Sequence, residues 1–321
     1  ILVGDVSSAG IIFYANTWSH NQMRQHTFDT VGIGQYGLLY LVSYNNGNTN
    51  YTDDYGMTLT ANNVNVATGG VISTSYTGYT GTGGPGATAY DCSGLGGAGH
   101  GGYGGTWNCS PGGSPYGNVY EPITFGSGNR QNESTGGGAL KLIVTGVLDL
   151  DGKIESNGSV EGSGGSVWLD VNEIGGTGTV QSTSLNADGP RGGGSGGRIA
   201  IYYNSLTSGN EFNFDTQTDA RGGLGGYWNT SVYGGNGTVY VEHKGVDPVH
   251  GAKLIADNKG RNSNGSGALI EDSYSFSEIR AVSYGNLRIL GNGSVLEMGD
   301  GGIVGDGTKP NVRVDGTILF T

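Results

Sequence analysis

The carboxylates best placed to carry out chemistry lie in one short segment, Asp-Leu-Asp-Gly-Lys-Ile-Glu, which contains Asp149, Asp151 and Glu155. In an extended strand, residues two apart share a face, so Asp149 and Asp151 would lie side by side. Paired carboxylates can act as general acid and base on a glycosidic bond. Arg198 or Arg191 could supply a neighbouring guanidinium. The same pattern is typical of a solvated strand face, and we favour that second interpretation.

Other reactive residue types lack the spacing that a site requires. Ser195 lies in Gly-Gly-Ser-Gly-Gly, which belongs to a repeat and not to the strand–turn–helix of a nucleophile elbow. No glycine run ends in the Gly-Lys-Ser/Thr of a phosphate loop. Only His20 and His26 lie near each other among the histidines, and neither has acids or cysteines at metal-ligand spacing. We therefore expect no metal, no cofactor and no enzymatic activity.

The chain has two cysteines, Cys92 and Cys109, in a segment with few apolar residues. A disulfide between them would close a loop of about 17 residues and contribute roughly 3 kcal/mol. Two free thiols in a reducing compartment are the alternative. We predict the disulfide, because little else in the surrounding sequence would order the loop.

Eight Asn-X-Ser/Thr sequences are candidate glycosylation sites if the source glycosylates such acceptors. Four of them are Asn-Gly pairs, from which a glycan would project at a turn. In a bacterium, the same residues would be turn asparagines only. The acceptors are Asn50, Asn108, Asn132, Asn157, Asn229, Asn236, Asn264 and Asn292.

A repeated block of sequence contains several of these residues. A glycine run followed by an alternating strand occurs at Leu140, Val167, Ile199 and Val239, about 27, 32 and 40 residues apart. Glycine provides 67 of 321 residues, but there is no collagen period, and the strand-like runs are too β-prone for a disordered chain. The repeats predict parallel stacking of the units, with glycines allowing close approach between backbones.

Charge and hydropathy exclude several partners. The net charge is −12 and no basic cluster is present, so neither a nucleic acid nor an anionic membrane surface is expected to bind. There is no apolar run of about 18 residues that would predict membrane insertion. Apolar strand-like sequence at both ends suggests a processed or partial piece of a longer protein, or a subunit whose ends are covered by neighbours.

The pattern along the chain predicts three regions. Residues 1–56 form an N-terminal β region with a capping or assembly role, and residues 57–245 carry the glycine-rich repeats. Within the repeats, residues 79–135 lack strand-like sequence, and we call them the glycine-rich insertion. Residues 246–321 continue with short strands, and the segment 273–282 is better explained as a strand than as a helix.

The blocks His100-Gly-Gly-Tyr-Gly-Gly and Gly193-Gly-Ser-Gly-Gly-Arg-Ile-Ala-Ile-Tyr-Tyr carry a family resemblance. With the segments at 59–73 and 116–122, they resemble the glycine-rich β-solenoid regions of large secreted or cell-surface, adhesin-like proteins. The resemblance covers residues 57–245. It implies an all-β, right-handed parallel β-helix and an extracellular setting, but it does not point to any particular enzymatic activity.

These observations favour a non-catalytic, extracellular structural or adhesive protein, as a subunit or segment of a surface fibre. Its expected partners are copies of itself end to end or neighbouring protein segments, and carbohydrate. The alternative is a β-helical carbohydrate-active enzyme or tailspike that uses Asp149, Asp151 and Arg198. A third hypothesis is an ice- or carbohydrate-binding module, although the scattered threonines do not form the regular rows that ice binding needs.

Overall fold

A computed structural model describes most of the chain and shows a predominantly β protein, with 48% of residues in strands and 3% in helices. The described residues are 2–3, 9–14, 24–47, 50–88, 96–129, 134–186, 191–226, 232–263, 265–270, 273–290, 293–308 and 311–321. Among them, no helix is long and apolar enough to cross a membrane. The strand predicted at 273–282 is confirmed.

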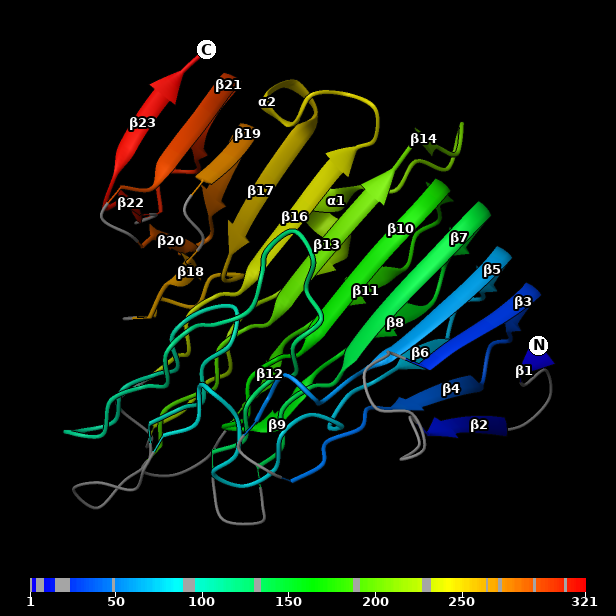
Figure 1. The fold of residues 1–321 in the computed structure, drawn as a ribbon, viewed down its shortest axis with the longest axis horizontal. Coiled ribbons are helices and arrows are strands. Elements are labelled where there is room, and N and C mark those ends of the chain that lie inside the picture. Colours follow the sequence, from blue (N-terminus) through cyan, green and yellow to red (C-terminus); the bar gives the residue numbers. More distant parts are fainter. Residues whose placement is uncertain are drawn as a thin grey trace.

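One large sheet runs the length of the molecule (Figure 1). Neighbouring strands along its path are β1 (Leu2–Val3), β3 (Arg24–Ile33), β5 (Met57–Val66), β7 (Ala139–Leu150), β10 (Ser166–Gly175), β13 (Arg198–Tyr203), β16 (Thr238–His243), β17 (Ala252–Asp257), β19 (Ser273–Val282), β21 (Val295–Gly305) and β23 (Thr317–Phe320), with β14 (Ser205–Leu206) beside β10.

Three smaller sheets accompany it. The first contains β15 (Thr218–Asp219), β11 (Thr179–Gln181), β8 (Lys153–Glu155), β6 (Val71–Ser73), β4 (Gly37–Val42) and β2 (Ala9–Tyr14). The second pairs β12 (Ser184–Leu185) with β9 (Gly158–Val160), and the third contains β18 (Gly267–Leu269), β20 (Asn286–Ile289) and β22 (Asn311–Val314). The described residues contain two helices, α1 (Phe214–Gln217) and α2 (Pro248–Gly251), and each is a single turn.

The sequence repeats lie in register, as predicted. Val167 on β10 is opposite Leu140 on one side and Ile199 on the other, and Ile199 is in turn opposite Val239. The glycines that precede these strands allow the backbones to approach closely. A Cβ on Gly197 would lie 2.1 Å from the carbonyl oxygen of Gly165, a distance that no side chain tolerates.

The predicted right-handed parallel β-helix, however, is wrong. In the described part of the chain, the strands form a large mixed sheet and no closed solenoid, and the direction of the sheet reverses between β16 and β17, which are antiparallel. The reversal follows from local sequence. Gly245 has a φ of +80°, Asp247 caps α2 by accepting a hydrogen bond from the backbone N–H of Val249, and Pro248 begins the helical turn.

The two larger buried cores lie on opposite faces of the same sheet near the reversal. On β16, Val239 and Val241 pack in the first core, which contains the strands before the reversal. Tyr240, between them, packs in the second core with Leu254 of β17 and Phe276 of β19. Because side chains alternate across a strand, β16 contributes to both cores at once.

Candidate functional site

The structure separates the residues that would form the predicted enzymatic site. Along β10, Gly175 is opposite Asp149 and Ser166 is opposite Arg198, about nine residues apart. At roughly 3.3 Å per residue, Asp149 and Arg198 are therefore about 30 Å apart along the strand direction. Asp151 directly follows the last residue of β7, so it lies beyond Asp149 on the side away from Arg198. These three residues do not form one site.

Each of the three carboxylates accepts hydrogen bonds from neighbouring side chains. Asp149 accepts from Asn65 at 2.9 Å, and Asp151 accepts from the backbone N–H and hydroxyl of Thr177, both at 2.9 Å. Glu155 accepts from Ser73 at 3.0 Å and also from Ser75 and Asn157. All three carboxylates bridge successive layers of the fold, which is a structural role.

Arg198 is completely buried and joins three parts of the chain. Its guanidinium donates to the carbonyl oxygen of Tyr116 in the glycine-rich insertion at 2.8 Å. It also donates to the hydroxyl of Thr238 on β16 and to the carbonyl oxygen of Ala268 on β18, both at 3.1 Å. Arg198 therefore holds the insertion against the point where the sheet passes from one core to the other.

His100 lies beside Arg198 and is also fully buried. Burial first, and then the positive charge of Arg198, lower the pKa of His100 to about 3, so the imidazole is neutral. Its Nδ1 lies 2.7 Å from the carbonyl oxygen of Gly164, which can only accept. Nδ1 therefore carries the proton, and Nε2 accepts from the hydroxyl of Thr124 at 2.8 Å. The centroids of the His100 and Tyr116 rings are 4.7 Å apart.

The remaining predicted residues also have structural environments. Ser195 is buried, and its hydroxyl accepts from the backbone N–H of His100 at 2.9 Å. Arg191 pairs with the buried carboxylate of Glu161 at 2.8 Å. Within the described part of the chain, no group of three or more His, Cys, Asp or Glu residues could hold a metal ion. His20 lies outside the described residues.

The structure bears on only some of the predicted modification sites. Cys109 is disulfide-bonded, while Cys92, its predicted partner, lies outside the described residues. Asn50 and Asn108 are exposed. Four further acceptors lie outside the described residues: Asn132, Asn229, Asn264 and Asn292.

Burial opposes the expectation that a glycan projects from Asn157 or Asn236. The side chain of Asn157 accepts from Thr183 twice, each time at 2.9 Å, and donates to Glu155. The Asn236 side chain is fully buried, and it donates to the carbonyl oxygen of Gly237 at 2.8 Å. A glycan on either amide nitrogen would displace these bonds, so both residues are structural asparagines.

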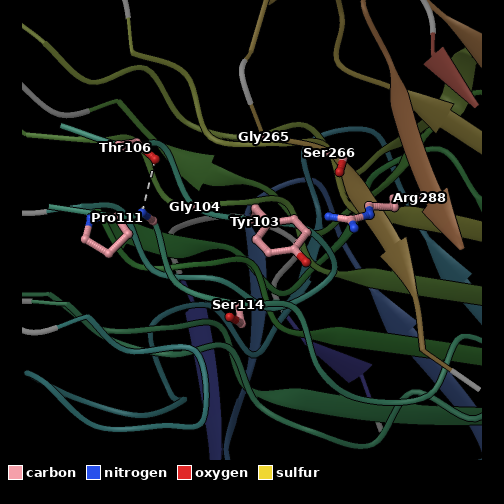
Figure 2. A pocket seen from close by; sticks show the side chains of 9 residues that line it. Tyr103, Gly104, Thr106, Pro111, Ser114, Gly265, Ser266 and Arg288 are labelled. Carbon is pink, nitrogen blue, oxygen red and sulfur yellow. Dashed lines mark hydrogen bonds between the residues drawn. The ribbon is translucent and has the colours of Figure 1, made fainter. Parts of the chain in front are cut away.

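Sequence reasoning missed a pocket of about 430 Å³ between the glycine-rich insertion and the third small sheet (Figure 2). The phenol of Tyr103 lies at its centre, and Figure 2 shows the guanidinium of Arg288 directed toward it from β20. Three residues with hydroxyl side chains also line the pocket: Thr106, Ser114 and Ser266. Three glycines and a proline complete the lining: Gly104, Gly112, Gly265 and Pro111.

The wall of this pocket is built by backbone hydrogen bonds between distant segments. The N–H of Tyr103 donates to the carbonyl oxygen of Ser266 at 2.9 Å, and the N–H of Gly104 donates to Gly113 at 3.0 Å. Gly104 must be glycine here, because a Cβ would lie 1.8 Å from the carbonyl oxygen of Gly97. No spacing in the sequence links Tyr103 to Ser266 or Arg288.

Comparison with known proteins gives no family for this chain. No family model matches it, and neither a curated protein nor a solved structure does. The interpretation of its function therefore rests on the residues and geometry described above.

Proposed function

We propose that this chain is a non-catalytic, extracellular structural or adhesive protein that serves as a subunit or segment of a surface fibre. The observation that carries the proposal is the continuous ladder of eleven neighbouring strands from β1 to β23. In such a ladder, backbone N–H and C=O groups pair from one strand to the next, which opposes local opening. A long, stable body of this kind suits a mechanical role.

The edge of the large sheet supports end-to-end association. All four residues of β23 are exposed, and three of them are apolar: Ile318, Leu319 and Phe320, the last with 72% of its surface accessible. An exposed apolar edge strand is a template for pairing with another strand. A second copy or a neighbouring protein segment that paired with β23 would continue the ladder.

The chemical character of the chain supports an extracellular setting. Only 13% of residues are charged, and the chain is rich in Asn, Ser, Thr and Tyr, which carry uncharged amide and hydroxyl groups. Cys109 is disulfide-bonded, and disulfides persist mainly in oxidising compartments outside the reducing cytosol. The net charge of −12 favours solubility of the individual protein.

A polysaccharide degradation screen tests this proposal against the enzymatic alternative. The protein is incubated with a panel of plant, animal and microbial polysaccharides, and new reducing ends and unsaturated products are measured. We expect no release above that of the heat-treated protein. Cleavage by the wild-type protein above that of the heat-treated control would overturn the non-catalytic proposal, whichever residues carry it.

A further inference from the structure

The pocket around Tyr103 combines one flat aromatic surface with many hydrogen-bonding groups. Most small-molecule pockets are lined chiefly by apolar side chains, whereas the side chains here are a phenol, a guanidinium, three hydroxyls and one proline. A saccharide matches this lining, because one face of its ring carries C–H groups and its edge carries hydroxyls that donate and accept. The Tyr103 ring offers the surface for stacking, and its hydroxyl can bond to the sugar edge.

The Arg288 guanidinium at the pocket is already engaged on one edge by a carboxylate of the protein. The Nε and Nη2 of Arg288 donate to Asp315 at 3.2 and 3.1 Å, and Arg313 donates to the same carboxylate at 2.7 Å. The two bonds from Arg288 use two of the five N–H donors of its guanidinium. Asp315 therefore occupies the Nε–Nη2 edge of the Arg288 guanidinium, and that edge is not free to clamp a carboxylate of a ligand. The N–H groups that remain can each donate to a hydroxyl of a neutral ligand.

The pocket is also fixed in shape before a ligand arrives. Tyr103 is bonded through its backbone to Ser266, and the N–H of Gly112 donates to the hydroxyl of Thr106 at 3.3 Å, as drawn in Figure 2. Such a pocket loses little conformational freedom on binding. We infer that it binds a neutral saccharide unit, by stacking on Tyr103 and hydrogen bonding to Arg288 and Ser266.

This inference rests on the proposed function in one respect, because it names the partner for adhesion. Saturation-transfer NMR on the intact chain tests it, with the methyl glycosides of glucose, galactose, mannose and N-acetylglucosamine as probes and glucuronate as the acidic comparator. We expect at least one neutral glycoside to bind with a dissociation constant in the range of about 1 mM, typical of weak single-site contacts. Tyr103→Ala should weaken binding by about tenfold or more, and Tyr103→Phe by less.

Two further variants keep the test independent of folding defects. Ser114 is exposed at the pocket, so Ser114→Tyr should block the pocket and abolish binding without removing a packed side chain. Tyr36, which is 57% exposed and does not line the pocket, provides the control variant Tyr36→Ala, which should bind like the wild type.

Three outcomes would overturn the inference: no signal from any neutral glycoside, binding that survives Ser114→Tyr, or binding of glucuronate alone. The measurement uses the protein in solution and does not depend on fibre assembly. Failure to bind sugar would therefore leave the structural proposal standing, and failure to assemble would leave the sugar site standing.

Discussion

His100 makes the buried contact between the glycine-rich insertion and the sheet sensitive to pH. Burial, and secondly Arg198, lower the pKa of His100 to about 3 in the folded protein. In the unfolded chain the imidazole has its ordinary pKa of about 6.5. Between these two values, the unfolded state binds a proton at this residue and the folded state does not.

The magnitude follows from linkage between proton binding and folding. The free energy of unfolding falls by about 1.4 kcal/mol for each pH unit when the unfolded state binds one extra proton. The contribution of His100 is fully present above pH 6.5 and is lost progressively as the pH falls toward 3. Over about 3.5 pH units, the total loss is about 4–5 kcal/mol.

Urea unfolding of the wild type and of His100→Gln, between pH 7 and pH 4, measures this contribution. The glutamine amide can still donate to the carbonyl oxygen of Gly164 but does not titrate. Each protein is compared with its own stability at pH 7, so a general destabilisation by the substitution cancels. Below pH 6, the wild type should lose about 1.4 kcal/mol more per pH unit than the variant. Equal slopes in the two proteins would refute the buried, neutral state of His100.

Three further substitutions test the contacts described above. Arg198→Met should lower the free energy of unfolding in a urea titration by about 3–5 kcal/mol, because buried acceptors in three segments lose their donor. The control Arg313→Met, at an exposed side chain, should change it by less than about 1 kcal/mol. Gly197→Ala should lower the free energy of unfolding by about 3 kcal/mol or more, because the added Cβ clashes with backbone. Gly209→Ala, where the φ is +78° but the space is open, should lower it by only about 1 kcal/mol. Similar melting temperatures for the two variants would contradict this explanation. Phe320→Lys should weaken self-association in sedimentation velocity while leaving thermal stability nearly unchanged, and unaltered association would exclude the β23 edge.

The repeats made the local register predictable from sequence. Aligning the blocks at Leu140, Val167, Ile199 and Val239 places residues opposite one another as the strands pair. This succeeds because every repeat carries the same physical signal, a glycine run that permits close backbone packing and then an alternating apolar strand. The close approach expected of the glycines is confirmed at Gly197.

The overall architecture was not predictable in the same way. The repeats do not predict a second core, yet Tyr240 and Ala200 on the outer face of the strands belong to one. Periodicity shows that a face is buried and not which element buries it. A local signal for the reversal was present in the sequence. Gly245 has a positive φ, and Asp247-Pro248 begins a helical turn, and the chain reverses direction through this segment between β16 and β17.

The candidate sites were likewise not predictable from the sequence. Pairing Asp149 with Arg198 assumed that a repeat brings its polar residues together, whereas parallel register places them at opposite ends of the strands. The pocket joins Tyr103 to Arg288 through packing of the insertion against a distant sheet. Only the tertiary structure brings those two residues together.

Electron microscopy of material isolated from its native source tests the central proposal most directly. Eleven strands at a spacing of about 4.8 Å give each chain a length of roughly 50 Å along the sheet. The account predicts filaments in which this protein recurs in an axial repeat of at least that length, and antibody labelling should decorate them at the same interval. Isolated particles of a single chain, with no filament at any concentration, would contradict the fibre proposal.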